Sequence, residues 1–182
     1  MKMSKKNKII ICLLIVAAIL FCTIKFWAIP ANRARRAEYV RNQTDALTHE
    51  ISTILDYKSP YIGDAVNIGN LFGILPLNNV SMNFEINSET CALTVNYFDT
   101  VWNIGEEKVH RDLIYNSAAA MAAVDNLSEL TYNFSGGSYS FNRERMEEVF
   151  GSPLSELLEQ GNWSKEVQNK LNSLDFVGQF FE

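Results

Sequence analysis

Metal-binding and nucleophilic side chains are scarce in this sequence of 182 residues, which has two histidines and three cysteines. Two of the cysteines lie in one long apolar run, so Cys91 stands alone in the rest of the chain and has no partner for a disulfide there. Glu106 and His110 are spaced like two metal ligands on a helix, but a zinc site needs about four ligands and the only other histidine is His49. We therefore predict no metal site and no cofactor.

The motifs of the common catalytic classes are absent as well. The pair Gly136-Gly137 lies between two strand-like segments and lacks the lysine and Ser/Thr of a phosphate-binding loop. The chain contains neither G-x-S-x-G nor S-x-x-K, two patterns that carry a catalytic serine. Cys91 falls on the apolar face of a predicted strand with no recognisable base, which indicates a buried, inert thiol. We predict no catalytic residue and expect that the protein is not an enzyme.

Acidic residues are missing from the first 30 positions, and this divides the chain by charge. All 21 acidic residues follow Pro30, where 11 of the 16 basic residues lie, so this part has a formal net charge of −10. An acidic domain is repelled by phosphate backbones. We therefore predict no nucleic-acid partner.

Residues 9–29 form a run that is apolar apart from one threonine and Lys25. As a helix, these 21 residues span about 31 Å, close to the roughly 30 Å of a bilayer core. Pro30 is expected to end the span. A secretory signal peptide is the alternative, but cleavage after Ala28 would place the bulky Phe26 where a small residue is needed. We expect an uncleaved membrane anchor.

These features predict two parts: residues 1–30, a basic cytoplasmic stub with a transmembrane anchor, and residues 31–182, an extracytoplasmic domain. Four lysines precede the span and four arginines follow it closely, so the charge bias alone does not orient it. Long domains cross the membrane largely regardless of charge, which favours the outside. We predict a single-pass protein of the cell membrane with its N-terminus in the cytoplasm.

A helix is predicted from about residue 32 to residue 57. Its apolar positions alternate in spacings of three and four, as in a heptad pattern: Ala37, Val40, Thr44, Leu47, Ile51 and Ile54. The pattern covers fewer than three heptads. It allows either packing on the chain's own domain or a seam between two copies in a homodimer.

Two segments have the period-two alternation of β-hairpins with one buried face. In the first hairpin, around a turn at 88–90, the apolar positions are Met82, Phe84, Ile86, Cys91, Leu93, Val95 and Tyr97. In the second, around a turn at 135–138, they are Leu130, Tyr132, Phe134, Tyr139 and Phe141.

Helical segments surround the two hairpins. One is predicted for about residues 106–125, with a stripe of Val109, Leu113, Ser117, Ala120, Met121 and Val124. Another runs from the cap Asn142 to Gly151, and a short one follows Pro153. A last helix is expected to bury Trp163, Val167, Leu171 and Leu174. This order predicts an α+β fold in which helices cover one face of an antiparallel sheet of two hairpins.

The most irregular stretch is SPYIGDAVNIGNLFGILPL, residues 59–77. As scaffold, it would be a short helix capped by Asp64, with Gly69 and Gly73 forming a flat strip against a packed element, and with an apolar stripe of Ala65, Ile68, Leu71, Phe72 and Leu75. As a binding site, it would form the edge of a pocket lined by Tyr61, Asp64, Asn67 and Asn70. Both interpretations fit the sequence, and the scaffold is favoured.

Four segments in order resemble the bacterial domain-of-unknown-function family 4825: YKSPYIGDAVNIGNLFGILPL, ALTVNYFD, YNSAAAMAAVDNLSELTYNF and YSFNRERMEEVFG. The resemblance covers about residues 52–151. It implies a short N-terminal anchor and an extracytoplasmic domain in Gram-positive bacteria, with related domains on membrane-embedded sensor peptidases. The family has no established catalytic residues, so the resemblance assigns none here.

Three classes of function are open at this point. A membrane-tethered extracytoplasmic binding module, sensory or regulatory, with an unknown ligand and no catalysis, fits the tether and the missing catalytic set. A structural or assembly component of a cell-envelope complex would use the heptad-spaced helix or the apolar C-terminal tail with a protein partner. An envelope hydrolase would need titratable groups clustered in a cleft.

Overall fold

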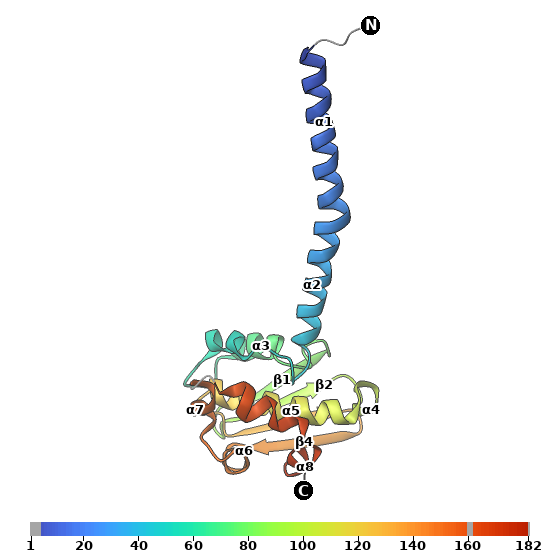
Figure 1. Cartoon of the computed structure of the whole chain (residues 1–182). Coiled ribbons are helices and arrows are strands. Elements are labelled where there is room, and N and C mark those ends of the chain that lie inside the picture. Colours follow the sequence, from blue (N-terminus) through green and yellow to red (C-terminus); the bar gives the residue numbers. More distant parts are fainter. Residues whose placement is uncertain (1–4, 160–161, 182) are drawn as a thin grey trace. The chain divides into compact units, whose positions relative to one another are not determined.

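The computed structural model of the chain describes residues 5–159 and 162–181, which are drawn in Figure 1. The chain divides into two compact units, Met1–Arg41 and Asn42–Glu182. The first unit is helical, and the second contains the sheet and the hydrophobic core.

The N-terminal helix consists of α1 (Lys5–Thr23), the π-helical turn η1 (Ile24–Ala28) and α2 (Ile29–Asn42). By length and composition it is able to cross a membrane, a property that an anchor and a signal sequence share. Pro30 does not end the helix, contrary to the prediction. The N–H of Ile29 bonds to the carbonyl of Ile24, five residues back. A proline ring crowds the carbonyl four residues back, and the wider π turn directly before it relieves that conflict.

The predicted helix over residues 32–57 is wrong in its second half. The helix ends at Asn42, and turns lead to a separate 3₁₀ helix, η2 (Ile51–Tyr57). Val40 is 55% exposed, whereas Ile54 is fully buried in the domain. The heptad-spaced positions therefore lie on different elements and form no single seam.

The sheet contains four strands in the order β1 (Met82–Asn87), β2 (Ala92–Tyr97), β3 (Glu129–Phe134) and β4 (Gly137–Asn142). Both predicted hairpins are present, β1–β2 and β3–β4, and each is antiparallel. Strands β2 and β3 run parallel, so the sheet is mixed rather than antiparallel. The connection between them contains an 18-residue helix, long enough to carry the chain back along the sheet to the end where β2 began. The α+β class is confirmed.

The two faces of the sheet differ as the alternation predicts. One face is buried and includes Leu93, Val95, Tyr132, Phe134 and Phe141. The other face is polar, and amide and hydroxyl groups bond across all four strands. Asn96 donates to Asn83 Oδ1 at 2.9 Å, Asn133 donates to Asn96 Oδ1 at 2.8 Å, and Ser138 donates to Asn133 Oδ1 at 2.8 Å.

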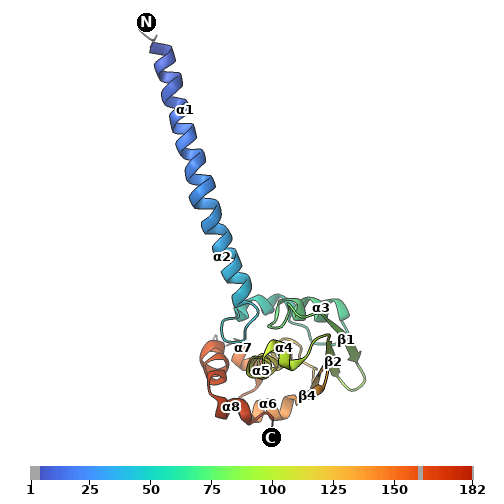
Figure 2. The same ribbon diagram turned by 90° about the vertical axis from the view of Figure 1, so that its right-hand side faces the viewer.

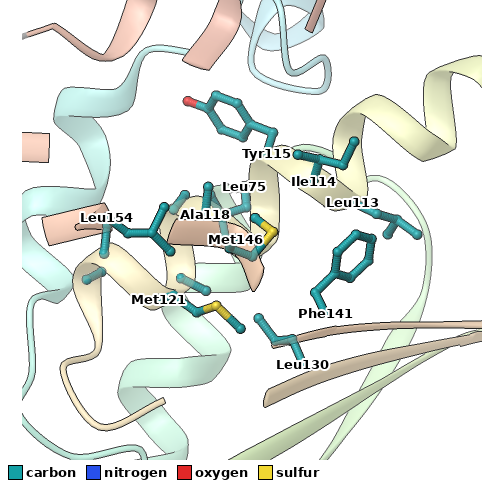
Figure 3. Close-up of a cluster of buried hydrophobic side chains, with 14 of the residues drawn as sticks. Leu75, Leu113, Ile114, Tyr115, Ala118, Met121, Leu130, Phe141, Met146 and Leu154 are labelled. Atoms are coloured by element: carbon teal, nitrogen blue, oxygen red, sulfur yellow. The ribbon is translucent and has the colours of Figure 1, made fainter. Parts of the chain in front are cut away.

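Helix α5 (Glu106–Ala123) is the centre of the domain. Every residue from Asp112 to Ala123 is buried, including the whole predicted stripe in that range. Figure 2 shows α5 end-on between the sheet and the C-terminal helices, among them α7 (Leu154–Glu159). Figure 3 shows Leu113, Ile114 and Met121 of this helix in one buried cluster with Leu130 of β3 and Phe141 of β4. Because the helix has neighbours on several sides, it is buried far beyond one stripe.

The C-terminal part is less regular than predicted. Helix α6 (Arg143–Phe150) has the expected ends: Asn142 Oδ1 accepts from Arg145 N at 2.8 Å, and Gly151 is left-handed. The last predicted helix is broken into η3 (Ser164–Gln168), η4 (Lys170–Asn172) and α8 (Leu174–Gly178). The side chain of Ser173 caps α8, so a new helix begins at Leu174. Leu174 is therefore not buried with the other three predicted residues and is 62% exposed.

A buried polar network holds residues 43–50 against α5 and explains why the first helix does not continue. Ala46 N donates to Asp112 Oδ1 at 2.8 Å, and Asp112 is also paired with Lys108. Gln168 Nε2 donates to the carbonyls of Ala46 and His49, both at 2.9 Å. These bonds take up backbone groups that would otherwise extend a helix.

His49 is 3% exposed and is bonded at both ring nitrogens. Nε2 lies 3.0 Å from the carbonyl oxygen of Ile74, so Nε2 carries the proton. Nδ1 lies 2.8 Å from the hydroxyl of Tyr115 and accepts its hydrogen. Burial lowers the pKa of His49 to about 4, because the charged ring would lose its hydration.

The strand register predicts unequal costs for substitutions on the two faces. Phe134 stacks on Tyr97 at 4.8 Å between ring centroids and is 7% exposed. Phe134→Ala in residues 42–182 should lower the free energy of unfolding by about 3 kcal/mol. Thr131→Ala, on the polar face of the same strand, should cost less than about 1 kcal/mol. Urea denaturation followed by circular dichroism measures both, and equal costs would contradict the register.

His49 should make the domain less stable in acid. Its pKa is lower in the folded domain than in the unfolded chain, so the unfolded chain takes up the proton first as the pH falls. The contribution of His49 to the free energy of unfolding is complete above about pH 6.5 and is lost as the pH falls toward about 4. The total loss is about 3 kcal/mol.

The measurement is the difference in unfolding free energy between the parent and His49→Gln at each pH. Burial raises the pKa of Asp112 to about 6, which acts in the opposite sense over the same window, and taking the difference removes that shared effect. The parent's margin over the variant should shrink from pH 6.5 to pH 4. A constant margin would show that His49 takes up its proton equally in both states.

Candidate functional site

Residues 59–77 contain helix α3 (Ala65–Ile74). The predicted cap is present: Asp64 Oδ1 accepts from Val66 N at 3.1 Å and from Asn67 N at 2.9 Å. The apolar stripe is confirmed at four positions and wrong at Ala65, which is exposed because it lies in the first turn; the buried members are Ile68, Leu71, Phe72 and Leu75.

The predicted packing of the two glycines is wrong. A Cβ atom added at Gly69 or Gly73 would meet no atom within 4 Å. Each glycine directly follows a buried residue, Ile68 or Phe72, and is therefore turned about 100° away from the core on the helix. The glycines face open space rather than a packed neighbour.

The four residues of the predicted binding edge differ in their surroundings. Asp64 is engaged as the helix cap, and Asn67 Nδ2 donates to the carbonyl of Tyr57 at 2.8 Å. Tyr61 is 69% exposed, and Asn70 is exposed on α3. None of the four lines the hollows described next. Two of them therefore serve the local fold.

A surface hollow of about 710 Å³ lies between α4 (Val101–Ile104), the start of α5 and the β3–β4 turn. Thr100 Oγ1 caps α4 by accepting from Asn103 N at 3.1 Å, and Gly105 (φ +103°) makes the sharp turn into α5. The tight β3–β4 turn is made by Gly136 (φ +96°). We call this cavity the α4 hollow; its lining includes Thr100, Trp102, Glu106, Ser135, Gly137 and Tyr139.

Large aromatic side chains stand out into solvent at and just before α4. Trp102, which lines the α4 hollow, is 91% exposed, and Phe98, which lines another hollow, is 65% exposed. The side chain of Trp102 is almost completely exposed and contributes almost nothing to the hydrophobic core. Packing in the core therefore does not explain why a tryptophan is found at this position. Exposed aromatic residues at the rim of a concave surface are typical of binding sites.

A second hollow of about 530 Å³ adjoins the first at Glu106, which lines both. We call it the tail hollow, because it is formed by the first turns of α5 and by the C-terminal segment, with Glu107, His110, Leu174, Val177 and Phe181 in its lining. His110 stacks on Phe181 with ring centroids 4.1 Å apart, and Tyr139 meets Phe181 edge-on at 5.7 Å. Partial burial lowers the pKa of His110, so its ring is neutral near pH 7.

The two hollows carry negative charge. Glu106 and Glu107 lie in the first turn of α5, and the linings include neither lysine nor arginine. Glu107 is paired with Arg111, one turn further along the helix. Glu106 has no ion pair among the described residues.

The other predicted chemical groups lie apart from these hollows. Cys91 is at the β1–β2 turn with φ +54°, half-buried, and not on the apolar face of a strand as predicted. Asn126 Nδ2 donates to the Cys91 sulfur at 3.4 Å. Over residues 5–159 and 162–181, no three His, Cys, Asp or Glu side chains gather as a metal site.

The reading of the sequence missed the α4 hollow, although a signal was present. The segment YFDTVWNIGEE, residues 97–107, places Phe98 and Trp102 among residues that favour turns and helix caps. Large aromatic residues in such a connection have no strand or helix face to bury them. What the sequence does not show is that the β3–β4 turn lies opposite them.

The comparisons with known proteins give one match. The family model for a domain of unknown function (DUF4825) matches residues 54–144, half of the chain. No curated protein and no solved structure matches. The matched region extends from η2 to the start of α6 and includes α4, the start of α5 and the β3–β4 turn.

Because the space around Gly69 is open, we expect its substitution by alanine to increase the stability of the domain. Gly69→Ala should stabilise residues 42–182 by up to about 1 kcal/mol, since alanine favours the helix and its methyl group meets nothing. Gly151→Ala is the matched control and should destabilise by about 1 kcal/mol, because Gly151 has φ +76°. Urea denaturation measures both changes in stability. A loss of stability in Gly69→Ala would instead support the interpretation that the glycines pack against a neighbouring element.

Proposed function

The chain belongs to the family of the domain of unknown function DUF4825, and we propose that it is a membrane-tethered extracytoplasmic binding module, sensory or regulatory, without catalytic activity. The ligand site is the α4 hollow. The observation that carries this proposal is Trp102, which is 91% exposed at the rim of a hollow of about 710 Å³.

The surroundings of Trp102 support a binding role. The hollow is bounded by the cap of α4, the turn at Gly105 and the turn at Gly136, three points that short-range bonds and backbone conformation hold in place. A site on such fixed ends binds with little loss of conformational entropy. The lining combines aromatic surface with a few polar groups, Thr100, Ser135 and Glu106, as ligand sites do.

The tether is the second part of the proposal. The apolar helix acts as an anchor and keeps the domain at the outer face of the cell membrane, in a Gram-positive envelope. Bulky residues at the plausible cleavage positions favour an anchor over a removable signal sequence. The resemblance of the four sequence segments to family 4825 supports the outside location.

Fractionation tests the tether. The protein should sediment with membranes at its full mass, and a protease added to intact protoplasts should digest the domain while a cytoplasmic marker survives. A mature protein that begins near residue 29 or 32 would show cleavage. Full protection from the protease would place the domain inside.

Photo-cross-linking in intact cells tests the binding site. A benzophenone amino acid at position 102 should form a discrete adduct, which mass spectrometry of the purified adduct identifies. The same group at Tyr61, exposed at the edge predicted from sequence, is the matched control and should form no such adduct. An adduct at Tyr61 and none at 102 would move the site to the start of α3.

A further inference from the structure

The chemistry of the α4 hollow points to the kind of ligand group that it recognises. Glu106 lies where the two hollows meet and has no ion pair among the described residues. Trp102 and Tyr139 line the same hollow. A carboxylate that lines the same hollow as aromatic rings offers a cation an opposite charge, and the rings offer it their negative faces.

No positively charged side chain in the linings of the two hollows competes with a ligand for the carboxylate of Glu106. They include no lysine or arginine, and His110 is neutral near pH 7 because burial lowers its pKa. The chain after Pro30 has a formal net charge of −10, so a positively charged ligand is attracted and an anionic one is repelled. Glu106 also interacts favourably with the helix N-terminus, but that interaction does not account for the exposed Trp102.

We propose that the α4 hollow binds a lysine or arginine side chain in an extended segment of a partner polypeptide, with an apolar neighbour of that side chain in the tail hollow. This inference rests on the proposed binding function and names its ligand class. Glu106 holds the cation, and Trp102 and Tyr139 pack against its stem and head group.

The size and composition of the hollows favour a polypeptide over a small amine. Their volumes, about 710 and 530 Å³, are each far larger than one ammonium or guanidinium group. They adjoin at Glu106, so an elongated ligand reaches both. The tail hollow offers the apolar side chains of Leu174, Val177 and Phe181, which suit an aliphatic residue next to the basic one.

The test uses the full chain in a nonionic detergent and three capped pentapeptides of the form Gly-Leu-X-Leu-Gly, with X arginine, lysine or citrulline. Citrulline has nearly the shape of arginine without its charge. Binding is followed by tryptophan fluorescence, and the signal is assigned to Trp102 by its loss in Trp102→Phe. Spermidine, a cation without apolar side chains, is the fourth probe.

We expect the arginine and lysine peptides to bind at least about fivefold more tightly than the citrulline peptide and spermidine. Glu106→Gln should weaken the arginine peptide about fivefold and leave the citrulline peptide unchanged. Glu144→Gln removes the same charge from the exposed first turn of α6 and is the matched control, which should have no effect.

Equal binding of all three peptides, with a fluorescence change that is absent in Trp102→Phe and is therefore assigned to Trp102, would overturn the cation inference and leave the binding site at the α4 hollow intact. Tighter binding of spermidine than of the peptides would overturn the inference that the ligand is a polypeptide. Equal losses in Glu106→Gln and Glu144→Gln would show attraction by net charge alone and would also overturn it. No response of Trp102 to any probe rejects the inference, whereas the proposed function then stands or falls by the cross-linking at position 102.

Discussion

The burial of residues 112–123 of helix α5 on all sides is the constraint on which the rest of the domain depends. One side of the helix packs on the sheet, and the others pack on α7, η2 and neighbouring segments. A helix so enclosed needs small side chains where its neighbours approach closely, which explains the alanine-rich run from residue 118 to residue 123. Its polar side chains must find partners inside. Asn116 donates to the carbonyl of Pro76 at 2.7 Å, and Ser117 donates to the hydroxyl of Tyr132 at 3.2 Å.

The N-terminal half of the same helix fixes two neighbouring segments. Asp112 and its partner Lys108 hold the backbone at residues 44–46, so the chain turns instead of extending the N-terminal helix. At its N-terminus, the turn at Gly105 sets α4 beside the β3–β4 turn and forms the α4 hollow. The proposed site is therefore built from the ends of the elements that make the core, which gives it a rigid base.

Two open surfaces of the domain differ in how far their polar groups are engaged. On the polar face of the sheet, Asn83, Asn96, Asn133 and Ser138 bond to one another across the strands, so the bonding capacity of this row is largely used within the fold. At the α4 hollow, Glu106 is unpaired among the described residues and Trp102 is almost fully exposed. Groups without a role in the fold are the better candidates for binding, and this contrast favours the hollow.

The sequence by itself determined the features that depend on near neighbours in the chain. Period-two alternation located both hairpins and their buried faces, and the caps Asp64 and Asn142 and the left-handed Gly151 fixed helix ends. These features follow from hydrogen bonds and side-chain directions within a few residues. The match of the family also rests on sequence alone.

Only the tertiary structure decided the rest. The parallel pairing of β2 with β3, the end of the first helix at Asn42 and the outward side of Gly69 depend on contacts between residues far apart in sequence. The bond from Ala46 to Asp112, for example, joins residues 66 positions apart. The α4 hollow likewise requires Trp102 and the turn at Gly136 to meet, and their separation along the chain hides that meeting from any local pattern.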